Sequence, residues 1–386
     1  MVFQYNQQVP VLFGDGAINQ LGEKVKELGC KKVICVYDSG VLAAGIAPKA
    51  EASLKAAGVD YVVYDKISSD PADTLVDECA ALAREAKVDG VVAIGGGSSM
   101  DCAKAAAVLY NRPGHIVDYF TAPPSMYDVC LPVVHVPTTA GTGSEVTQVA
   151  VISNHLDGSK PSVFMHSTLA IVDPELTHTV PPTVTANTGL DAFTHAAESI
   201  TAKGRNPRSE LLAKTAIEKI YANLPTAVQD GKNAKARYEL CLAANWAGIA
   251  FADTDCHLGH NLADGISCTF HSPHGYNCIM VNPELMKRCA AVVPAEVKVV
   301  GEAVGVEFTG SESNEEIGEK TAEGIRALMR KCGIKSPKEM GMDREKFIDC
   351  YKMAMEIDLG LRLNCPFEVT AEIVRDIYEK TYDNYQ

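Results

Sequence analysis

Short apolar runs alternate with longer stretches of helical spacing in the first half of the chain. The runs lie within residues 31–38, 59–65, 89–97 and 131–139, and they are rich in valine and isoleucine. β-branched residues favour strands, and a strand that is apolar at consecutive positions is covered on both faces. Helical stretches separate the runs, so the pattern predicts a mostly parallel sheet between two layers of helices. We therefore predict a Rossmann-like, nucleotide-binding α/β domain over residues 1–183.

The chain changes character after the turn-rich segment Val180–Thr185. Residues 206–224 and similar later stretches place apolar side chains at helical spacing, and few later runs resemble strands. We predict a second, all-α domain over residues 184–386. The chain has 386 residues, 47% of them hydrophobic, which is enough apolar material for the cores of two domains.

The overall charge argues against nucleic-acid and membrane partners. The 49 acidic and 35 basic side chains give a net charge of −14, which repels phosphate backbones and anionic lipids. No basic residue precedes Lys24, and no run of about 18 apolar residues occurs. The 13 cysteines include no C-x-x-C pair, so we expect reduced thiols, mostly in the core. These features favour a soluble cytoplasmic protein that acts on a small molecule.

Three consecutive glycines, at positions 95–97, end the third apolar run and precede a strong helical stretch. Glycine lets the backbone approach a ligand closely, and the start of the helix offers free N–H groups to a pyrophosphate. We predict a dinucleotide-phosphate site that includes Gly96, Gly97, Ser98 and Asp101. The alternative is a purely structural strand-to-helix turn, since Ser98 and Asp101 also match a capping box.

A second loop, Pro137–Thr147, follows the fourth apolar run and is dense in hydroxyl groups and glycine. Two such loops at the carboxyl ends of strands favour a dinucleotide site more strongly than one does. Neither loop has the G-x-G-x-x-G or the Walker A pattern.

An acidic residue, Asp38, ends the first apolar run. A carboxylate at this place can accept hydrogen bonds from the adenosine ribose and repel a 2′-phosphate, so it favours NAD over NADP. The alternative is that Asp38 caps a helix that begins near Val41.

Four of the ten histidines lie in one 18-residue window, which indicates a metal site: His257, His260, His271 and His274. Cys256 and Cys268 lie close to these histidines, but their spacing is not typical of a thiolate site, and we predict that neither binds the metal.

Upstream of this window, Asp191 and His195 are four residues apart and would share one face of a helix. They could hold one ion, although a buried histidine paired with a carboxylate is the alternative for such a pair alone. His260 and His274 lie on either side of the helix-breaking Pro273 and could complete a four-ligand site. Oxygen and imidazole ligands suit Fe²⁺, Zn²⁺, Mn²⁺ or Co²⁺, and an open coordination position would make the site catalytic.

Four motifs resemble, in the right order, those of the iron-containing (group III) alcohol dehydrogenase family. They are GGGSSMDCAK at 95–104, PTTAGTGSEVT at 137–147, GLDAFTHAAES at 189–199 and HNLADGISCTFHSPHG at 260–275. The resemblance spans nearly the whole chain. It implies Fe²⁺, with Zn²⁺ or Mn²⁺ as alternatives, on the ligands Asp191, His195, His260 and His274. Around NAD(H) we expect Asp38, Asp70, Gly96, Gly97, Ser98, Asp101, Thr138, Thr139, Thr142, Ser144, Lys160 and Leu176.

The resemblance implies reversible hydride transfer between NAD(H) and a short-chain alcohol/aldehyde pair, most often as an aldehyde reductase, in a homodimer or larger homo-oligomer. One position departs from the family: many members have a further histidine four residues after the third ligand, where this chain has Asp264. One turn from His260, Asp264 could orient an imidazole. We expect Asp264 and His271 to be the catalytic side chains of a proton relay, with His257 as an alternative; both histidines could also simply flank the site.

Three other functions fit parts of the pattern. The same chemistry could act on an anionic semialdehyde or on sulfoacetaldehyde. A lyase similar to dehydroquinate synthase would also use NAD and a metal, but it would not accumulate NADH. A non-catalytic metal-binding protein would bind both cofactors without turnover.

Overall fold

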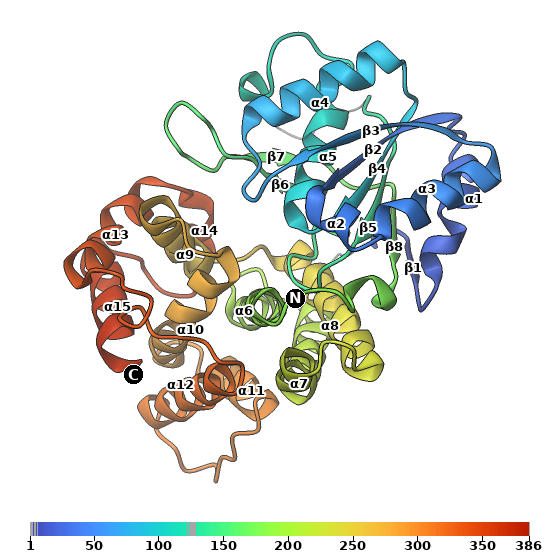
Figure 1. Cartoon of the computed structure of the whole chain (residues 1–386). Helices are drawn as coiled ribbons and strands as arrows, with labels where there is room; N and C mark the ends of the chain where they lie inside the picture. The colour runs from blue at the N-terminus through green and yellow to red at the C-terminus, as the bar shows by residue number, and fades with distance from the viewer. Residues whose placement is uncertain (1–2, 4, 6, 121, 123–128, 386) are drawn as a thin grey trace. The chain divides into compact units, whose positions relative to one another are not determined.

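All four apolar runs form strands of one sheet in the computed structural model, which describes residues 3, 5, 7–120, 122 and 129–385 (Figure 1). They are β2 (Lys32–Asp38), β3 (Asp60–Ile67), β4 (Gly90–Gly95) and β5 (Val133–Pro137). With β1 (Val11–Phe13) and β8 (Leu169–Val172) they form a six-stranded sheet in the order β1-β8-β5-β4-β2-β3, and all of its pairs are parallel. The predicted Rossmann-like α/β architecture is confirmed. A separate antiparallel pair joins β6 (Val149–Val151) to β7 (Ser162–Phe164).

The strands are apolar at consecutive positions because helices cover both faces of the sheet. On β2, Ile34 and Val36 join one core cluster, whereas Val33 and Cys35 join the other. The first cluster includes side chains of α4 (Asp73–Ala86) and α5 (Gly97–Leu109), and the second includes side chains of α1 (Leu21–Glu27) and α3 (Ile46–Ala57). Shorter elements complete this part of the chain: α2 (Ser39–Ala43), η1 (Ala17–Gln20), η2 (Ile116–Tyr119) and η4 (Pro174–Thr177).

The described residues divide into two compact units, one of residues 7–180 and one of residues 181–385 together with residues 3 and 5, so the main boundary lies just before the predicted one at 183. The described residues of the second unit form helices and no strand, which confirms the all-α prediction. These helices are α6 (Pro182–Thr201), α7 (Pro207–Gln229), α8 (Ala234–Thr254), α9 (Leu258–Phe270), α10 (His274–Ala290), α11 (Pro294–Ala303), α12 (Asn314–Lys331), α13 (Arg344–Glu356), α14 (Leu359–Asn364) and α15 (Ala371–Asn384).

Helix α6 is the central helix of this unit. It packs against α7, α8 and α10, and its side chains are buried at every position from Gly189 to Thr201. A helix buried on all sides has no solvent-facing stripe, so any polar side chain on it needs a partner inside the protein. The polar side chains of α6 are therefore the first place to look for a functional site.

Two general expectations can be compared with the structure. All 13 cysteines are free thiols, and all but Cys130 and Cys268 are buried, as predicted. Within the described residues, no helix is both long enough and apolar enough to cross a membrane.

Candidate metal centre and cofactor loops

Three helices of the second unit bring the four predicted metal ligands together. Asp191 and His195 project from α6, and both are almost fully buried. His260 comes from the first turn of α9, and His274 is the first residue of α10. Pro273 separates these two helices, as the sequence predicted, and the turn that it makes lets both imidazoles approach α6.

The distances between Asp191, His260 and His274 suit side chains that share one ion, whereas His195 groups with His260 and Cys256 and not with Asp191 and His274. The Nε2 atoms of His260 and His274 lie 3.9 Å and 3.8 Å from Oδ1 of Asp191. The ring of His195 stacks on the ring of His260, with 4.5 Å between their centroids. Because nitrogen and oxygen ligands each lie about 2.1 Å from a zinc-like ion, two of them can be at most about 4.2 Å apart.

Two polar atoms at the centre of the group indicate that a metal ion binds there. Oδ1 of Asp191 and Nε2 of His260 are buried and have no hydrogen-bond partner within the described part of the chain. Burial raises the pKa of Asp191 to about 6, since a lone carboxylate is unfavourable away from water. A divalent ion would satisfy both atoms and keep the carboxylate ionised, so the residues fit the group that the motifs imply.

Glu198 holds His260 from the side opposite to Asp191, and the sequence analysis did not select it. Its Oε2 lies 3.1 Å from Nδ1 of His260, and its two oxygens accept the backbone N–H groups of His257 and His260. Burial alone would raise the pKa of Glu198, but the two imidazoles and the N–H of His257 hold it at about 2. The contact to Nδ1 directs Nε2 of His260 toward Asp191. A signal was present, because Glu198 follows His195 by three residues on the same helix.

Asp264 contacts a different imidazole from the one expected. Its Oδ1 lies 3.6 Å from Nδ1 of His274, at ion-pair distance, while Glu198 occupies the corresponding place beside His260. The reason is tertiary, because α10 folds back after Pro273 and brings His274 next to the middle of α9. Each of the two imidazoles thus has a carboxylate at Nδ1 and turns Nε2 toward Asp191.

The other two histidines of the window have different surroundings. His257 is buried, and its Nε2 lies 2.8 Å from the hydroxyl oxygen of Thr201. Burial lowers the pKa of His257, and the nearby Glu198 carboxylate opposes this shift. His271 is exposed at the C-terminal end of α9, in the left-handed backbone region with φ 51°. Neither histidine belongs to the groups of potential metal ligands that the described residues form.

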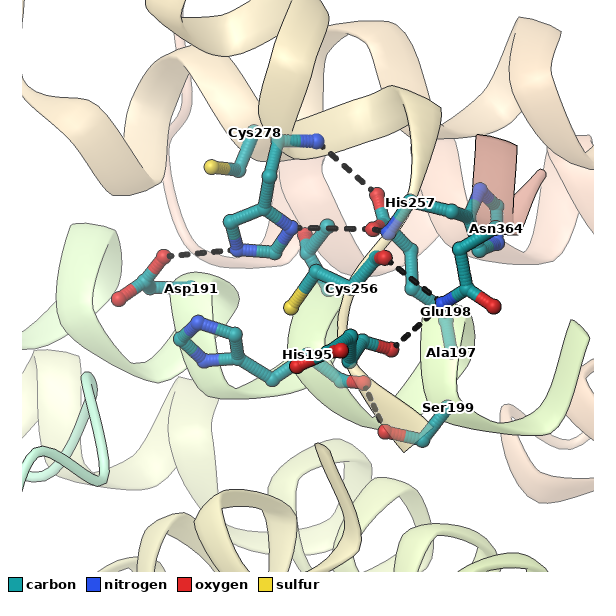
Figure 2. Close-up of polar contacts among 12 residues, drawn as sticks. Asp191, His195, Ala197, Glu198, Ser199, Cys256, His257, Cys278 and Asn364 are labelled. Carbon is teal, nitrogen blue, oxygen red and sulfur yellow. Dashed lines mark hydrogen bonds and ion pairs between the residues drawn. The ribbon is translucent and has the colours of Figure 1, made fainter. Parts of the chain in front are cut away.

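Two thiols lie closer to the histidines than the sequence suggested. Cys256, predicted to stand outside the site, has its Sγ within 4.8 Å of ligand atoms of His195 and His260. It precedes α9 in a turn whose carbonyl groups accept hydrogen bonds from the side chain of Asn364 (Figure 2). Cys278, which the sequence analysis did not consider, forms a second group with Asp191, His260 and His274. Cys268 is half-buried and belongs to neither group.

In the first unit, the two predicted cofactor loops lie against each other. Gly95 at the end of β4 pairs with Pro137 at the end of β5, and the N–H of Thr138 donates to the carbonyl of Gly95 at 2.9 Å. A Cβ atom on Gly96 would lie 3.3 Å from Oγ1 of Thr139, and one on Gly97 would lie 2.8 Å from Cγ2 of Thr142. A side chain at position 97 would therefore push against the second loop, and one at position 96 would make a tight contact with it.

The capping box of Ser98 and Asp101, the alternative to a phosphate site, does not form. Helix α5 begins after Gly96, and no side chain caps this end. The Asp101 carboxylate instead accepts hydrogen bonds from the Ser144 hydroxyl at 2.6 Å and from the N–H of Val151 at 3.1 Å. An uncapped helix start leaves its backbone N–H groups to a bound phosphate, which suits a dinucleotide site.

Lys104 fixes the second loop to α5. It is fully buried, and its Nζ lies within 3.0 Å of the carbonyl oxygens of Ser144, Thr147 and Val149 and of the Ser144 hydroxyl. Ser144 and Asp101 were predicted to contact the cofactor. In the structure, the Ser144 hydroxyl contacts Nζ of Lys104 and donates to the Asp101 carboxylate, so both side chains help to hold the loop in place. Contact of either with the cofactor stays a prediction.

The remaining predicted cofactor residues occupy several positions of the first unit. Asp38 ends β2, and its Oδ1 accepts the N–H of Val41 at 2.8 Å, so the capping alternative is confirmed. Asp70 pairs with Lys160 at 3.0 Å. Leu176 lies in η4 with its side chain buried in the core, so only its backbone could face a ligand.

The contact between the two loops can be tested by Gly97→Ala. Gly97 lies in the first turn of α5, where alanine suits the backbone, so the added methyl group acts mainly by pushing Thr142 away. We expect NADH binding to weaken about tenfold, a loss of about 1.4 kcal/mol. Adding Thr142→Ser removes the methyl group that clashes and should restore part of the affinity, whereas Thr142→Ser alone serves as the control. Fluorescence titration with NADH measures all three, and equal affinity of Gly97→Ala and native protein would refute the close packing.

Comparisons with known proteins give the same picture for both units. The family model described as "Iron-containing alcohol dehydrogenase" matches residues 9–174, and "Fe-containing alcohol dehydrogenase family, C-terminal" matches residues 185–382. Alcohol dehydrogenase 4 of Saccharomyces cerevisiae is 32% identical over 375 residues, which are 96% of each chain.

Solved structures of alcohol- and aldehyde-converting enzymes superpose on nearly the whole chain. A 1,3-propanediol oxidoreductase superposes with a TM-score of 0.92 at 29% identity and covers 98% of this chain and 100% of its own. A sulfoacetaldehyde reductase from Bifidobacterium kashiwanohense, solved in complex with NAD⁺, has a TM-score of 0.89 at 29% identity and covers 99% of each chain.

Proposed function

The chain belongs to the iron-containing alcohol dehydrogenase family, and on that premise we propose that it reduces a short-chain aldehyde with NADH in a reversible, metal-dependent hydride transfer. The observation that carries this proposal is that Asp191, His260 and His274 meet where Oδ1 of Asp191 and Nε2 of His260 are buried and have no hydrogen-bond partner among the described residues. Asp191, His195, His260 and His274 would hold the ion. When bound, the ion supplies a Lewis acid for the substrate oxygen, and the nicotinamide supplies the hydride.

The side chains around the ligands set their orientation and charge. Glu198 and Asp264 each face the Nδ1 atom of one imidazole, which favours the tautomer whose Nε2 is a free electron-pair donor. We propose Asp264 and His271 as the side chains that pass a proton between the substrate oxygen and water. Asp264 is half-buried beside His274, and His271 is exposed, so the pair offers an inner and an outer proton carrier.

In the first unit, we propose that the loops after β4 and β5 bind the pyrophosphate of NAD through backbone N–H groups and the hydroxyls of Ser98, Thr138, Thr139 and Thr142. Asp38 would bind the adenosine ribose, and the Asp70–Lys160 pair would contribute a cation near the dinucleotide. We also propose a homodimer or larger homo-oligomer in the cytoplasm. Light scattering would establish the mass of the assembly.

NADH preference should depend on the charge of Asp38. We expect Asp38→Gly to raise the ratio of NADPH to NADH use by about tenfold or more, because the carboxylate no longer repels a 2′-phosphate. Glycine is tolerated at a helix N-cap at a cost of a few tenths of a kcal/mol, so α2 should persist. Asp38→Asn keeps the capping oxygen without the charge and should shift the ratio in the same direction. An unchanged ratio of kcat/KM values in both variants would remove Asp38 from cofactor choice.

The proposed reaction can be tested by NADH oxidation with a panel of aldehydes. Protein loaded with Fe²⁺ or Zn²⁺ should oxidise NADH with at least one neutral C2 to C4 aldehyde. The panel should include sulfoacetaldehyde and succinic semialdehyde, because one structural neighbour is a sulfoacetaldehyde reductase. No turnover with any member would refute the proposal, and product formation without net NADH consumption would indicate a lyase.

A further inference from the structure

A thiol occupies a ligand position in the candidate metal centre. Cys278 lies on α10 and is fully buried, and its Sγ is 3.4 Å from Nε2 of His274. The same sulfur lies within 4.8 Å of ligand atoms of Asp191 and His260. It is therefore surrounded by three of the four side chains that would hold the ion.

The spacing on α10 places this sulfur on the same helical face as His274. The two residues are four apart, one turn of the helix, as are Asp191 and His195 on α6. Two neighbouring helices thus each present a pair of donor atoms toward one point. A buried cysteine that only fills core space needs no such neighbours.

The distances are those of atoms that can share an ion. A thiolate lies about 2.3 Å and an imidazole nitrogen about 2.1 Å from zinc, so the two can be at most about 4.4 Å apart. The observed 3.4 Å between Sγ of Cys278 and Nε2 of His274 lies within this limit. Burial raises the pKa of the Cys278 thiol to about 12, although the neighbouring His260 lowers it in part.

We propose that Cys278 is a sulfur ligand of this metal centre and gives it a preference for Zn²⁺ or Co²⁺ over the harder Mn²⁺. The inference rests on the proposed metal site and adds a donor to its oxygen and imidazole set. On binding, the sulfur–metal bond replaces the S–H bond, and the proton leaves to solvent. Thiolate ligands favour softer ions, whereas Mn²⁺ prefers oxygen, which explains the direction of the preference.

The second thiol near the histidines is a weaker candidate. Cys256 groups with His195 and His260 but not with Asp191 or His274. It therefore lies beside two of the ligands, whereas Cys278 lies among three. Cys289, also buried on α10, belongs to neither group and provides a control for loss of a core thiol on the same helix.

Cobalt spectroscopy tests the proposal directly. The native protein loaded with Co²⁺ should show a near-ultraviolet sulfur-to-cobalt charge-transfer band. Cys278→Ser should lose this band, while Cys256→Ser and Cys289→Ser should keep it. In competition titrations, Cys278→Ser should lower the ratio of Zn²⁺ to Mn²⁺ affinity by at least about tenfold. A packing defect would weaken binding of both ions equally, so an unchanged ratio would overturn the proposal.

X-ray absorption at the zinc edge of the native protein removes any dependence on the folding of a variant. A sulfur scatterer at about 2.3 Å is expected, and a shell of nitrogen and oxygen alone would overturn the role of Cys278. Native protein with cobalt d–d bands but no sulfur band would overturn this inference and leave the proposed metal site intact. Failure of the native protein to bind any of these ions would refute the proposed site and this inference together.

Discussion

His260→Ala is expected to abolish metal retention and NADH-dependent turnover while leaving NADH binding largely intact. His260 is the only described side chain that belongs to both groups of potential ligands around the centre, one with Asp191, His274 and Cys278 and one with His195 and Cys256. Its Nε2 faces Oδ1 of Asp191, and without the imidazole the buried carboxylate loses its nearest partner on α9. The NADH loops belong to the other compact unit, so their local structure should not depend on this side chain.

The measurements are metal content after dialysis, steady-state turnover and NADH fluorescence titration. His115→Ala is the matched control, because His115 is an exposed histidine of the first unit that pairs with Asp77. It should retain metal and activity. A His260→Ala protein that keeps its metal through dialysis and still turns over would exclude His260 as a ligand.

Glu198→Ala should have the second largest effect, on both metal affinity and folding. The carboxylate accepts the N–H groups of His257 and His260 and contacts Nδ1 of His260, all in a buried environment. Removing it leaves buried donors without an acceptor and frees the imidazole to rotate. We expect metal affinity to fall 10- to 100-fold and the free energy of unfolding to drop by about 3 kcal/mol.

Glu198→Gln separates these two effects. The amide keeps one acceptor oxygen and nearly the same volume, so stability should fall less than in Glu198→Ala, whereas the lost charge should still weaken metal binding. The similar volume is important because the carboxylate of Glu198 packs closely on Gly259, where even an added Cβ atom would clash with Oε1. Calorimetric metal titration and urea unfolding of the metal-free proteins give both quantities. Native metal affinity in both variants would show that Glu198 does not orient His260.

The stability of the metal-free protein at acid pH should also depend on the ionised carboxylate of Glu198. The pKa of Glu198 is about 2 in the folded protein and 4.5 in the unfolded chain, so the unfolded chain binds the proton more readily. The stabilisation from the ionised carboxylate is therefore complete above pH 4.5 and is lost as the pH falls toward 2. The stability difference between the native protein and Glu198→Gln should shrink over this range. A difference independent of pH would contradict the assigned pKa.

Most of the fold could be predicted from local sequence. Helices cover both faces of β2, so Ile34 and Val36 on one face and Val33 and Cys35 on the other must all be apolar. This requirement appears in the sequence as a run of consecutive apolar residues. The helical spacing after Val180 and the break at Pro273 are equally local. The spacing of Asp191 and His195 indicated a shared helical face, and the family motifs singled out His260 and His274 as their partners.

The remaining features depended on contacts between residues distant in sequence. Glu198 and His260 lie 62 positions apart, and their contact exists only because α9 begins against α6. Asp264 faces His274 instead of His260, and Cys278 lies beside the proposed ligand His274, because α10 folds back after Pro273. Asp101 fits a local capping box in sequence, yet Ser144 and Val151, more than 40 residues away, offer its carboxylate better-placed donors. The sequence by itself thus determined which elements form and which motifs carry the chemistry, because periodicity and spacing act within a few turns. Only the tertiary structure decided which side chains orient the ligands, since that depends on how separate helices pack.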